Sequence, residues 1–264
     1  MTQPIPDPTP APVHEAAQQG FSHAAQAYAQ GRPDYPAELL PWLQQALGLA
    51  PGRQVLDLGA GTGKFTRLLA RTGAQVTAVE PVVEMRAQLA AALPGVPVLG
   101  GTAEALPLPD ASVDAVVCAQ AFHWFANEAA LQEIHRVLRP GGCLGLVWNV
   151  RDESVDWVAR LTALITPHEG DAPRFYKGDW RRPFTGRWFG PLALSRFSYQ
   201  HVGPPAQVIV DRFMSVSFIA ALPPAAQAEV RQQLQDLVAQ HPALRGQSTV
   251  AFPYQTEAYL ARRL

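Results

Sequence analysis

The sequence predicts an α/β protein whose core is a doubly wound, mostly parallel seven-stranded sheet, followed by a C-terminal helical cap. Between residues 54 and 149, short and continuously apolar segments alternate with amphipathic helical segments. That alternation is typical of a parallel sheet covered by helices on both faces. After residue 149 it stops, and long helical segments separate two further strand-like segments. Of the 264 residues, 48% are hydrophobic, which is enough for a sizeable core.

The expected elements begin after a proline-rich tail. Proline recurs at alternate positions near the start of the chain, so residues 1–16 are expected to be disordered. Helical composition follows at residues 21–30 and again at residues 37–49, on either side of the break RPDYP. We expect these helices to form a lid next to a ligand-binding core, the two together occupying residues 17–150.

Strands and helices then alternate along the core. The expected strands are residues 54–59, 74–80, 96–101, 112–120 and 143–149. The expected helices are residues 64–72, 82–93 and 131–138.

Residues 151–264 are expected to supply the cap helices and the two strands that complete the sheet. The strands are expected at 192–199 and 249–263, and the helices at 204–222 and 223–241. Residues 151–190 show no clear strand alternation and are assigned to the cap.

Charge and composition exclude several classes of partner. The formal net charge is −1, so no global field draws the chain to nucleic acid or to a membrane. The longest apolar runs, such as residues 113–121, are far too short to span a bilayer, and no secretory leader is evident. Cys118 and Cys143 lie in expected buried strands, which favours free thiols. We therefore expect a cytoplasmic monomer or homodimer without membrane or nucleic-acid partners.

A glycine-rich turn follows the first expected strand, in the stretch VLDLGAGTGKF at residues 55–65. Its three glycines predict that a ligand lies close to the backbone. A phosphate-binding P-loop has four residues between its glycines and then Lys-Ser/Thr, whereas Phe65 holds the hydroxyl position here. A dinucleotide fingerprint has the spacing G-x-G-x-x-G, and the spacing here is G-x-G-x-G. An NAD(P)-binding oxidoreductase is therefore the weaker alternative.

S-adenosylmethionine (SAM) is the ligand that the turn favours. SAM carries no phosphate, and its ammonium and sulfonium charges favour a nearby carboxylate such as Asp57. Glu80 ends the second strand, 21 residues after Gly59, where a carboxylate can accept both ribose hydroxyls. An acid at a strand end can equally cap a helix or face solvent, but its combination with the glycine turn favours the ribose.

Longer stretches of the chain resemble a known family. VLDLGAGTGKFTRLLA, AVEP, GTAEALPLPDASVDAVV and LRPGG match, in order and spacing, the class I SAM-dependent methyltransferases. YAQGRPDYP, AQAFHWF and VWNVRDE are similar to a small-molecule subgroup that includes trans-aconitate methyltransferase. The resemblance implies the Rossmann-like methyltransferase fold, SAM as cofactor, and methyl transfer to a small acceptor, on a carboxylate or hydroxyl oxygen rather than nitrogen or carbon. The alternative from another class is a non-catalytic SAM-binding sensor or scaffold.

The resemblance also implies a set of cofactor contacts. The backbone of Gly59, Ala60 and Gly61 would approach the methionine part of SAM, Asp57 would bond its ammonium, and Glu80 would hold the ribose. Further implied contacts are Tyr28 and Arg32 as a lid over the cofactor carboxylate, Met85 on the adenine ring, and Gln120 beside the methionine part. Met85 is equally compatible with a core position, and RPDYP with a turn packed on the sheet.

The loop after the third expected strand departs from the family pattern. The family usually has Gly-Asp-Ala there, with the aspartate on the adenine amine, and this chain has Gly101-Thr102-Ala103-Glu104. Thr102 offers only a hydroxyl, whereas the backbone N–H of Ala103 remains available to a ring nitrogen. Thr102, Ala103 and Glu104 complete the candidate cofactor residues.

Two residues after the fourth expected strand are candidates for the chemistry. Ligands of open α/β sheets bind outside the carboxyl ends of the strands, where AQAFHWF lies. His123 is the candidate general base, because the ordinary pKa of histidine is near neutral, although a structural histidine bonded to backbone is the alternative. Trp124 is expected to form an apolar wall beside the acceptor. A base is needed only when the acceptor must lose a proton.

Residues 174–189, RFYKGDWRRPFTGRWF, interleave basic and aromatic side chains. Such a segment can bind single-stranded nucleic acid, or present arginines to a carboxylate substrate. The interpretation we favour is a cap segment that packs Trp180, Phe184 and Trp188 inward and leaves its arginines solvated. No histidine–carboxylate cluster has metal-ligand spacing, so no metal is expected.

Overall fold

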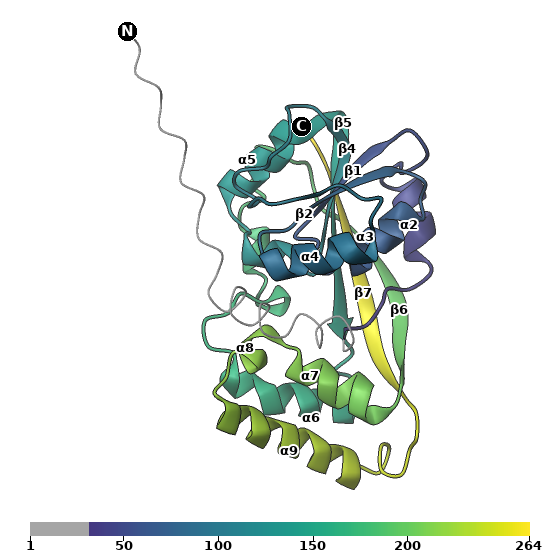
Figure 1. The fold of residues 1–264 in the computed structure, drawn as a ribbon, viewed down its shortest axis with the longest axis vertical. Coiled ribbons are helices and arrows are strands. Elements are labelled where there is room, and N and C mark those ends of the chain that lie inside the picture. The colour runs from purple at the N-terminus through teal and green to yellow at the C-terminus, as the bar shows by residue number, and fades with distance from the viewer. Residues whose placement is uncertain (1–31) are drawn as a thin grey trace.

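The computed structural model describes residues 32–264 and places a seven-stranded sheet above a helical cap (Figure 1). The strand order is β3-β2-β1-β4-β5-β7-β6. The predicted tail, the predicted helix at 21–30 and Tyr28 lie outside the described residues.

The seven predicted strands are all present. Their bounds are β1 Gln54–Leu58, β2 Gln75–Val79, β3 Val98–Leu99, β4 Val113–Ala119, β5 Leu138–Arg151, β6 Ala193–Gly203 and β7 Val250–Arg262. Neighbouring strands from β3 to β5 pair in parallel, whereas β7 is antiparallel to both β5 and β6. The predicted fold class, a mostly parallel doubly wound sheet with a C-terminal helical cap, is confirmed.

Helices surround the sheet and form the cap. The α-helices are α2 Leu39–Gln45, α3 Lys64–Ala70, α4 Val83–Ala92, α5 Glu128–Val137, α6 Asp156–Ile165, α7 Arg212–Met214, α8 Ser217–Ala220 and α9 Pro224–Gln240. Short 3-10 turns are η1 Phe122–Trp124, η2 Thr166–His168, η3 Phe175–Lys177 and η4 Asp179–Arg181, and η5 Ala206–Asp211 is a π-helix.

The two faces of the sheet have separate cores because successive side chains of a strand point to opposite faces. Leu56 and Leu58 of β1 pack with α5 and with residues 180–189 on one face. Val55 packs with α2 and α3 on the other. Helices therefore cover both faces, as the continuous apolar strands predict.

The cap has a third core of its own. Apolar residues of α6, η5, α7, α8 and α9 pack together with the start of β7, where Phe252 is fully buried. Strands β5 and β7 are long, at 14 and 13 residues, and in Figure 1 they run from the sheet down to the cap. The cap is thus built directly on the ends of two central strands.

Three details of the predicted cap differ in the structure. Residues 204–222 form η5, α7 and α8 with a break at Ser215, not one helix. Helix α6 lies in the stretch for which the sequence predicted no regular element. Residues 174–189 do not join the cap core: Trp180 is buried against the sheet, its ring centroid 4.6 Å from that of Trp148. Their aromatic rings mostly pack inward, as the favoured interpretation expects.

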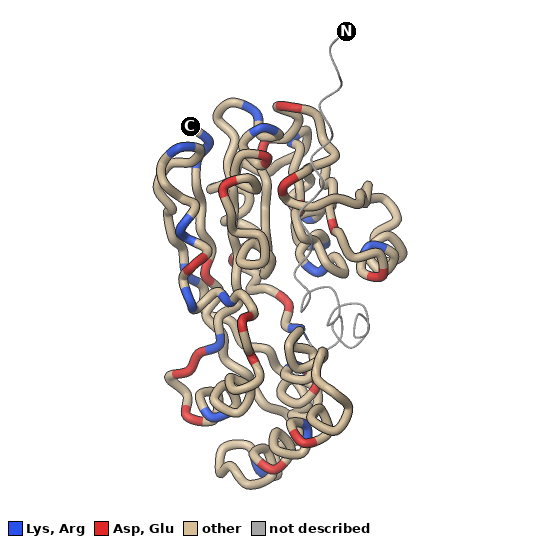
Figure 2. The backbone as a smooth tube through the Cα atoms, turned by 90° about the vertical axis from the view of Figure 1, so that its left-hand side faces the viewer, with Lys and Arg blue, Asp and Glu red and all other residues tan. Residues whose placement is uncertain are grey.

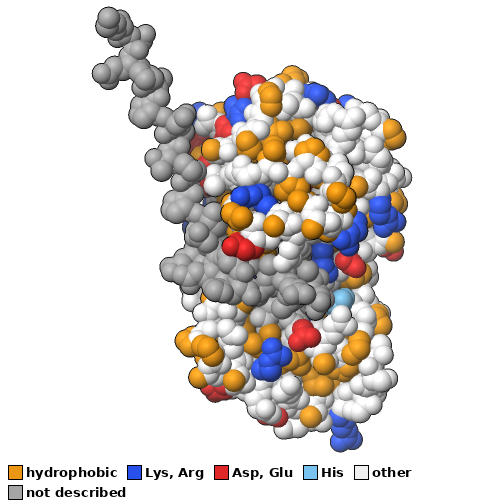
Figure 3. Space-filling model, in the orientation of Figure 1, with side chains coloured by type: hydrophobic (Ala, Val, Ile, Leu, Met, Phe, Trp, Pro, Cys, Tyr) orange, Lys and Arg blue, Asp and Glu red, His pale blue; other side chains and the backbone are white. Residues whose placement is uncertain are grey.

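Charges of both signs are distributed over the described part of the chain. Figure 2 shows Lys and Arg interspersed with Asp and Glu along the backbone. On the face seen in Figure 3, hydrophobic side chains are scattered over both the sheet and the cap. None of the described helices is both long and apolar enough to cross a membrane.

Candidate functional site

The glycine turn after β1 is closed by backbone hydrogen bonds. The N–H groups of Gly59 and Ala60 both donate to the carbonyl of Val79, at 2.8 and 3.2 Å, which ties the turn to β2. Gly59, Gly61 and Gly63 have φ values of 70°, 56° and 85°, in the left-handed region that glycine adopts without a steric penalty. The turn lies where the strand order reverses between β1 and β4, which is the ligand-binding position of open α/β sheets.

Gly59→Ala is expected to destabilise the protein by about 2–5 kcal/mol, because left-handed backbone costs about 1–2 kcal/mol and overpacking adds about 1–3 kcal/mol. A Cβ at Gly59 would lie 2.7 Å from the Cβ of Ala121. Gly52→Ala is the matched control: its φ is 87°, but no atom lies within 4 Å of the added Cβ. Urea unfolding measures both variants, and equal losses of stability would contradict the close packing at Gly59.

Asp57 is the most unusual carboxylate near the turn. It is fully buried at the end of β1, and its Oδ2 accepts a hydrogen bond from the Thr66 hydroxyl at 2.6 Å. Its Oδ1 is buried and has no hydrogen-bond partner within the described part of the chain. Burial raises the pKa of Asp57 to about 7, and the nearby charge of Glu80 contributes to the rise. A buried acceptor left without a donor is costly, so this oxygen is suited to a cationic ligand group.

Glu80 points back into the turn. Its Oε2 accepts the Gly61 N–H at 2.8 Å and its Oε1 accepts the Val82 N–H at 2.9 Å, so it caps α4 and braces the turn together. Burial raises its pKa, while these two hydrogen bonds and Arg86 act in the opposite direction. Glu80 therefore lies beside the glycine turn. Its contact with the ribose of SAM stays a prediction.

The predicted adenine-side residues do not line the cavities described below. Met85 is buried, with its Sδ 3.8 Å from the point that a Cβ on Gly61 would occupy. Ala103 is buried, and the Thr102 Oγ1 is buried without a hydrogen-bond partner among residues 32–264. Glu104 accepts a hydrogen bond from the side chain of the α5 N-cap. Their roles toward adenine remain predictions.

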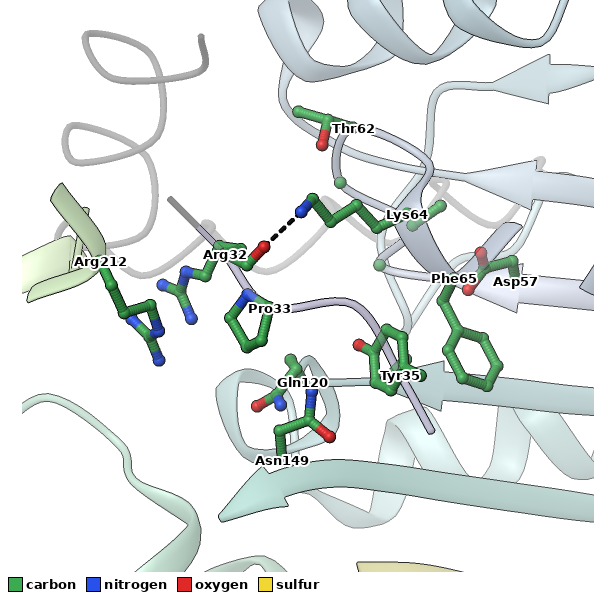
Figure 4. A pocket seen from close by; sticks show the side chains of 14 residues that line it. Arg32, Pro33, Tyr35, Asp57, Thr62, Lys64, Phe65, Gln120, Asn149 and Arg212 are labelled. Atoms are coloured by element: carbon green, nitrogen blue, oxygen red, sulfur yellow. Dashed lines mark hydrogen bonds between the residues drawn. The ribbon is translucent and has the colours of Figure 1, made fainter. Parts of the chain in front are cut away.

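A cavity opens beside the glycine turn, and we call it the turn cavity (Figure 4). It is lined by Arg32, Pro33, Tyr35, Asp57, Gly59, Ala60, Gly61, Thr62, Lys64, Phe65, Ala119, Gln120, Asn149 and Arg212. These residues come from the segment before α2, the turn itself, the ends of β4 and β5, and the cap.

Residues 32–36 cross the mouth of this cavity as a strap. The Lys64 ammonium donates to the carbonyl of Arg32 and lies 3.6 Å from the Asp34 carboxylate. The Asn149 amide donates to the carbonyl of Asp34 at 2.9 Å, and the Arg32 guanidinium reaches the carbonyl of Ser215 at 3.4 Å. The strap therefore connects the core to the cap, and Arg32 lines the turn cavity, whereas its role as a lid over the cofactor carboxylate stays a prediction.

A second cavity adjoins the first, and we call it the arginine cavity. It is lined by Arg32, Gln120, His123, Trp124, Trp148, Asn149, Val150, Arg151, Glu153, Thr162, Ile165, Thr166, Glu169, Arg174, Phe175, Tyr176, Arg212 and Ser217. Arg32, Gln120, Asn149 and Arg212 line both cavities. Gln120 forms the border in the left-handed conformation, with φ 58°, which is uncommon outside glycine and clusters at functional sites.

Positive charge predominates in the arginine cavity. Burial, together with the charges of Arg212 and Arg174, lowers the pKa of Arg151 to about 9. The wall of the cavity has two acidic residues, Glu153 and Glu169. The Glu169 carboxylate is already paired, with the Lys177 ammonium at 2.8 Å and the Arg174 guanidinium at 3.5 Å. Buried guanidinium groups that repel one another favour an anion between them.

His123 is not the near-neutral base that the sequence predicted. Its Nδ1 accepts a hydrogen bond from the indole N–H of Trp148 at 3.1 Å. Burial, with smaller effects of Arg174 and Arg32, lowers its pKa to about 3. The expectation of a near-neutral pKa was wrong because it assumed an ordinary environment, whereas a catalytic role of His123 stays a prediction. Trp124 also lines the arginine cavity. Its expected role as an apolar wall beside the acceptor stays a prediction.

Sequence reasoning named neither Lys64 nor Arg212 as a candidate and named Arg174 only within an aromatic segment. Lys64 directly follows the last glycine of the turn, which was a usable signal. Arg212 is buried and donates to the Tyr254 hydroxyl at 3.2 Å, but its sequence surroundings read as an ordinary amphipathic helix. Within residues 32–264, no group of three or more His, Cys, Asp and Glu residues is arranged to hold a metal ion.

The chain is similar in sequence and in fold to known methyltransferases. Residues 56–146 match the family described as a methyltransferase domain. The chain is 42% identical over 236 residues to an uncharacterized methyltransferase of Mycobacterium bovis, covering 89% of this chain and 92% of that protein. It is 37% identical over 237 residues to an uncharacterized methyltransferase-like protein of Schizosaccharomyces pombe, with the same coverage. A solved structure from Anaeromyxobacter dehalogenans, a candidate type II methyltransferase, has a TM-score of 0.61 at 25% identity and covers 88% of this chain and 96% of that one.

Proposed function

This chain belongs to the class I SAM-dependent methyltransferases, and from that premise we propose that it methylates a carboxylate oxygen of a small anionic acceptor. The observation that carries the proposal is the arginine cavity, which shares its border residues with the turn cavity. An acceptor bound among these arginines would lie directly beside the cofactor site. Membership of the trans-aconitate subgroup, the oligomeric state and the compartment stay predictions.

The residues around the turn cavity fit SAM. The buried Asp57 oxygen without a donor would accept the ammonium, and the open backbone at Gly59 to Gly61 would admit the methionine chain. The Lys64 ammonium and the Arg32 guanidinium at the mouth would pair with its carboxylate. In the ligand-free protein the Glu80 carboxylate accepts the Gly61 N–H. When SAM binds, it would accept the ribose hydroxyls, either in place of this N–H or together with it. Bound SAM would supply an electrophilic methyl group, which becomes a methyl ester on the acceptor as S-adenosylhomocysteine leaves.

The arginine cavity supports a carboxylate rather than a neutral acceptor. Arg151 is partly buried, with its Nη1 donating to the Thr162 hydroxyl at 3.1 Å, and Arg174 lies over the Phe218 ring at 5.2 Å. Planar guanidinium groups bind carboxylates in a bidentate manner. A carboxylate oxygen is already anionic, so the protein needs to orient the acceptor and exclude water but does not need to remove a proton. The absence of a near-neutral base at His123 agrees with that chemistry.

Turnover against a panel of small acceptors tests the proposal. Release of S-adenosylhomocysteine is measured with carboxylic acids, phenols and amines, and the product mass identifies a methyl ester. Carboxylic acids are expected to react, and turnover of phenols or amines alone would contradict the acceptor class. SAM binding without any turnover would favour the sensor alternative. NAD binding without SAM binding would contradict the cofactor.

Glu80→Ala is expected to weaken SAM binding about 10- to 100-fold, since hydrogen bonds to a charged group contribute about 1.5–3 kcal/mol. Calorimetry with SAM and with S-adenosylhomocysteine measures the change. Glu128→Ala is the matched control, because Glu128 is exposed, pairs with Arg187 and lines neither cavity. An unchanged affinity in Glu80→Ala would remove the ribose contact from the proposal.

A further inference from the structure

The hydrogen bond between Trp148 and His123 determines which nitrogen of the histidine carries a proton. An indole N–H can only donate, so the Nδ1 that receives it at 3.1 Å must be unprotonated. The neutral ring then has its proton on Nε2. His123 lines the arginine cavity, and with Nδ1 occupied by Trp148 the Nε2–H is the one hydrogen-bond donor that its ring has to offer a ligand there.

The packing of Trp148 holds this arrangement in place. The indole is buried in β5, with ring centroids 4.6 Å from Trp180 and 4.7 Å from Phe175. It cannot turn away without disturbing the core beneath the cavity. A second proton on His123 would set one N–H against another at Nδ1, which opposes protonation on geometric grounds alone.

The charges that face the ring oppose protonation as well. Arg174 and Arg32 act directly on His123, and burial lowers its pKa to about 3. The other titratable groups of the cavity wall are Arg151, Arg212, Glu153, Glu169 and Tyr176. Glu169 is occupied by Lys177 and by the Tyr176 hydroxyl, which donates to it at 2.6 Å. The acids of the wall therefore do not offset the arginines at His123.

We infer that His123 is held as a neutral hydrogen-bond donor to the anionic acceptor, and that Trp148 is the positioning residue that sets this tautomer. The inference rests on the proposed function, because it needs an acceptor with an anionic oxygen. A donor on one carboxylate oxygen would help to hold the acceptor while its other oxygen receives the methyl group. No proton leaves or enters His123 in this role.

The test follows the side-chain nitrogens of the full-length protein by NMR after labelling its seven histidines with ¹⁵N. The His123 signals are assigned by their loss in His123→Gln. The expected result is an Nε2–H tautomer that does not titrate between pH 5 and 8. Succinate, added with S-adenosylhomocysteine as a dicarboxylate probe, is expected to move the Nε2–H signal. In Trp148→Phe the ring is expected to lose its fixed tautomer and to titrate at higher pH than in the wild type.

Two substitutions of the histidine separate donation from shape. His123→Gln keeps an amide donor near the Nε2 position, and its succinate affinity is expected to stay within about threefold of the wild type. His123→Leu has no donor and is expected to bind succinate about tenfold or more weakly, as loss of a hydrogen bond to a charged group requires. Calorimetry measures both affinities, and equal affinities would overturn the donor role.

The outcomes distinguish this inference from the proposed function. An Nδ1–H tautomer, or titration of His123 between pH 5 and 8, would overturn the donor assignment even if succinate binds. Binding of succinate with an unmoved Nε2–H signal would also overturn it, while leaving the anionic acceptor intact. No binding of succinate to the wild type would count against the anionic acceptor and would remove the donor role with it.

Discussion

Asp57→Asn is expected to weaken SAM binding by roughly 30- to 4,000-fold, because removing one partner of a buried charge pair costs about 2–5 kcal/mol. Asp57 is fully buried, and one of its carboxylate oxygens has no donor within residues 32–264. The cationic ammonium of SAM would supply that donor. The asparagine keeps the shape and the contact with the Thr66 hydroxyl but brings no negative charge.

The same substitution is expected to stabilise the ligand-free protein above pH 7. Burial raises the pKa of Asp57 from 3.8 to about 7, so between these values the folded state holds a proton that the unfolded state has released. The free energy of unfolding therefore falls as pH rises through this window, by on the order of 4 kcal/mol. An asparagine side chain does not titrate, so this pH dependence is expected to disappear in the variant. Urea unfolding at pH 5 and pH 8 measures it.

Binding of SAM is expected to release a proton from the wild-type protein near pH 6. The ammonium favours the ionised carboxylate, so SAM affinity rises from pH 5 to pH 7, and calorimetry in buffers of different ionisation enthalpy detects the proton. Asp114→Asn is the control, because Asp114 pairs with Arg53 and Arg139 and lines neither cavity. Wild-type SAM affinity in Asp57→Asn would contradict the ammonium contact.

The sheet could be predicted because its signal is local. Each strand is a short apolar run next to its own helix, and the glycine turn depends only on spacing within residues 55–65. The cap was predicted only in part: Trp157, Val158, Leu161 and Ile165 of α6 have a helical spacing that the sequence displays, but no helix was assigned there. The break at Ser215 also follows from tertiary packing, which overrides the helical composition of residues 204–222.

The state of the site residues could not be predicted in the same way. The hydrogen-bond donor to His123 is Trp148, which is 25 residues away in the chain and arrives through the pairing of β4 with β5. Arg151, Arg174 and Arg212 come from the end of β5, the segment after η2 and helix α7, and only the folded chain brings them to one cavity. The sequence shows which residue types are present, but it does not show which side chains meet in the folded chain or how deeply they are buried.

Each cavity contains one charged group in an unfavourable environment, an acid in the turn cavity and a guanidinium in the arginine cavity, although Arg32, Lys64 and Arg212 also line the turn cavity. Asp57 places a buried carboxylate in the turn cavity, and Arg151 places a buried guanidinium in the arginine cavity, with Gln120 between them. Each charge is unfavourable in the ligand-free protein, as the raised pKa of Asp57 and the lowered pKa of Arg151 both indicate. A cationic cofactor and an anionic acceptor would each relieve one of them. The two charges therefore favour the cationic cofactor in the turn cavity and the anionic acceptor in the arginine cavity, and disfavour the reverse placement.

Arg151→Met is therefore expected to lower kcat/KM for the acceptor by about 100-fold, since truncating a buried hydrogen-bonded charge costs about 2–5 kcal/mol. SAM affinity is expected to stay within about threefold, because Arg151 does not line the turn cavity. The ligand-free protein is expected to keep or gain stability: burial lowers the pKa of Arg151 from 12.5 to about 9, so its charge disfavours folding at neutral pH. Arg160→Met, at a 62% exposed side chain of the same cap, is the control. Steady-state kinetics with each substrate varied in turn separates the two ligands, and an unchanged acceptor kcat/KM in Arg151→Met would place the acceptor elsewhere.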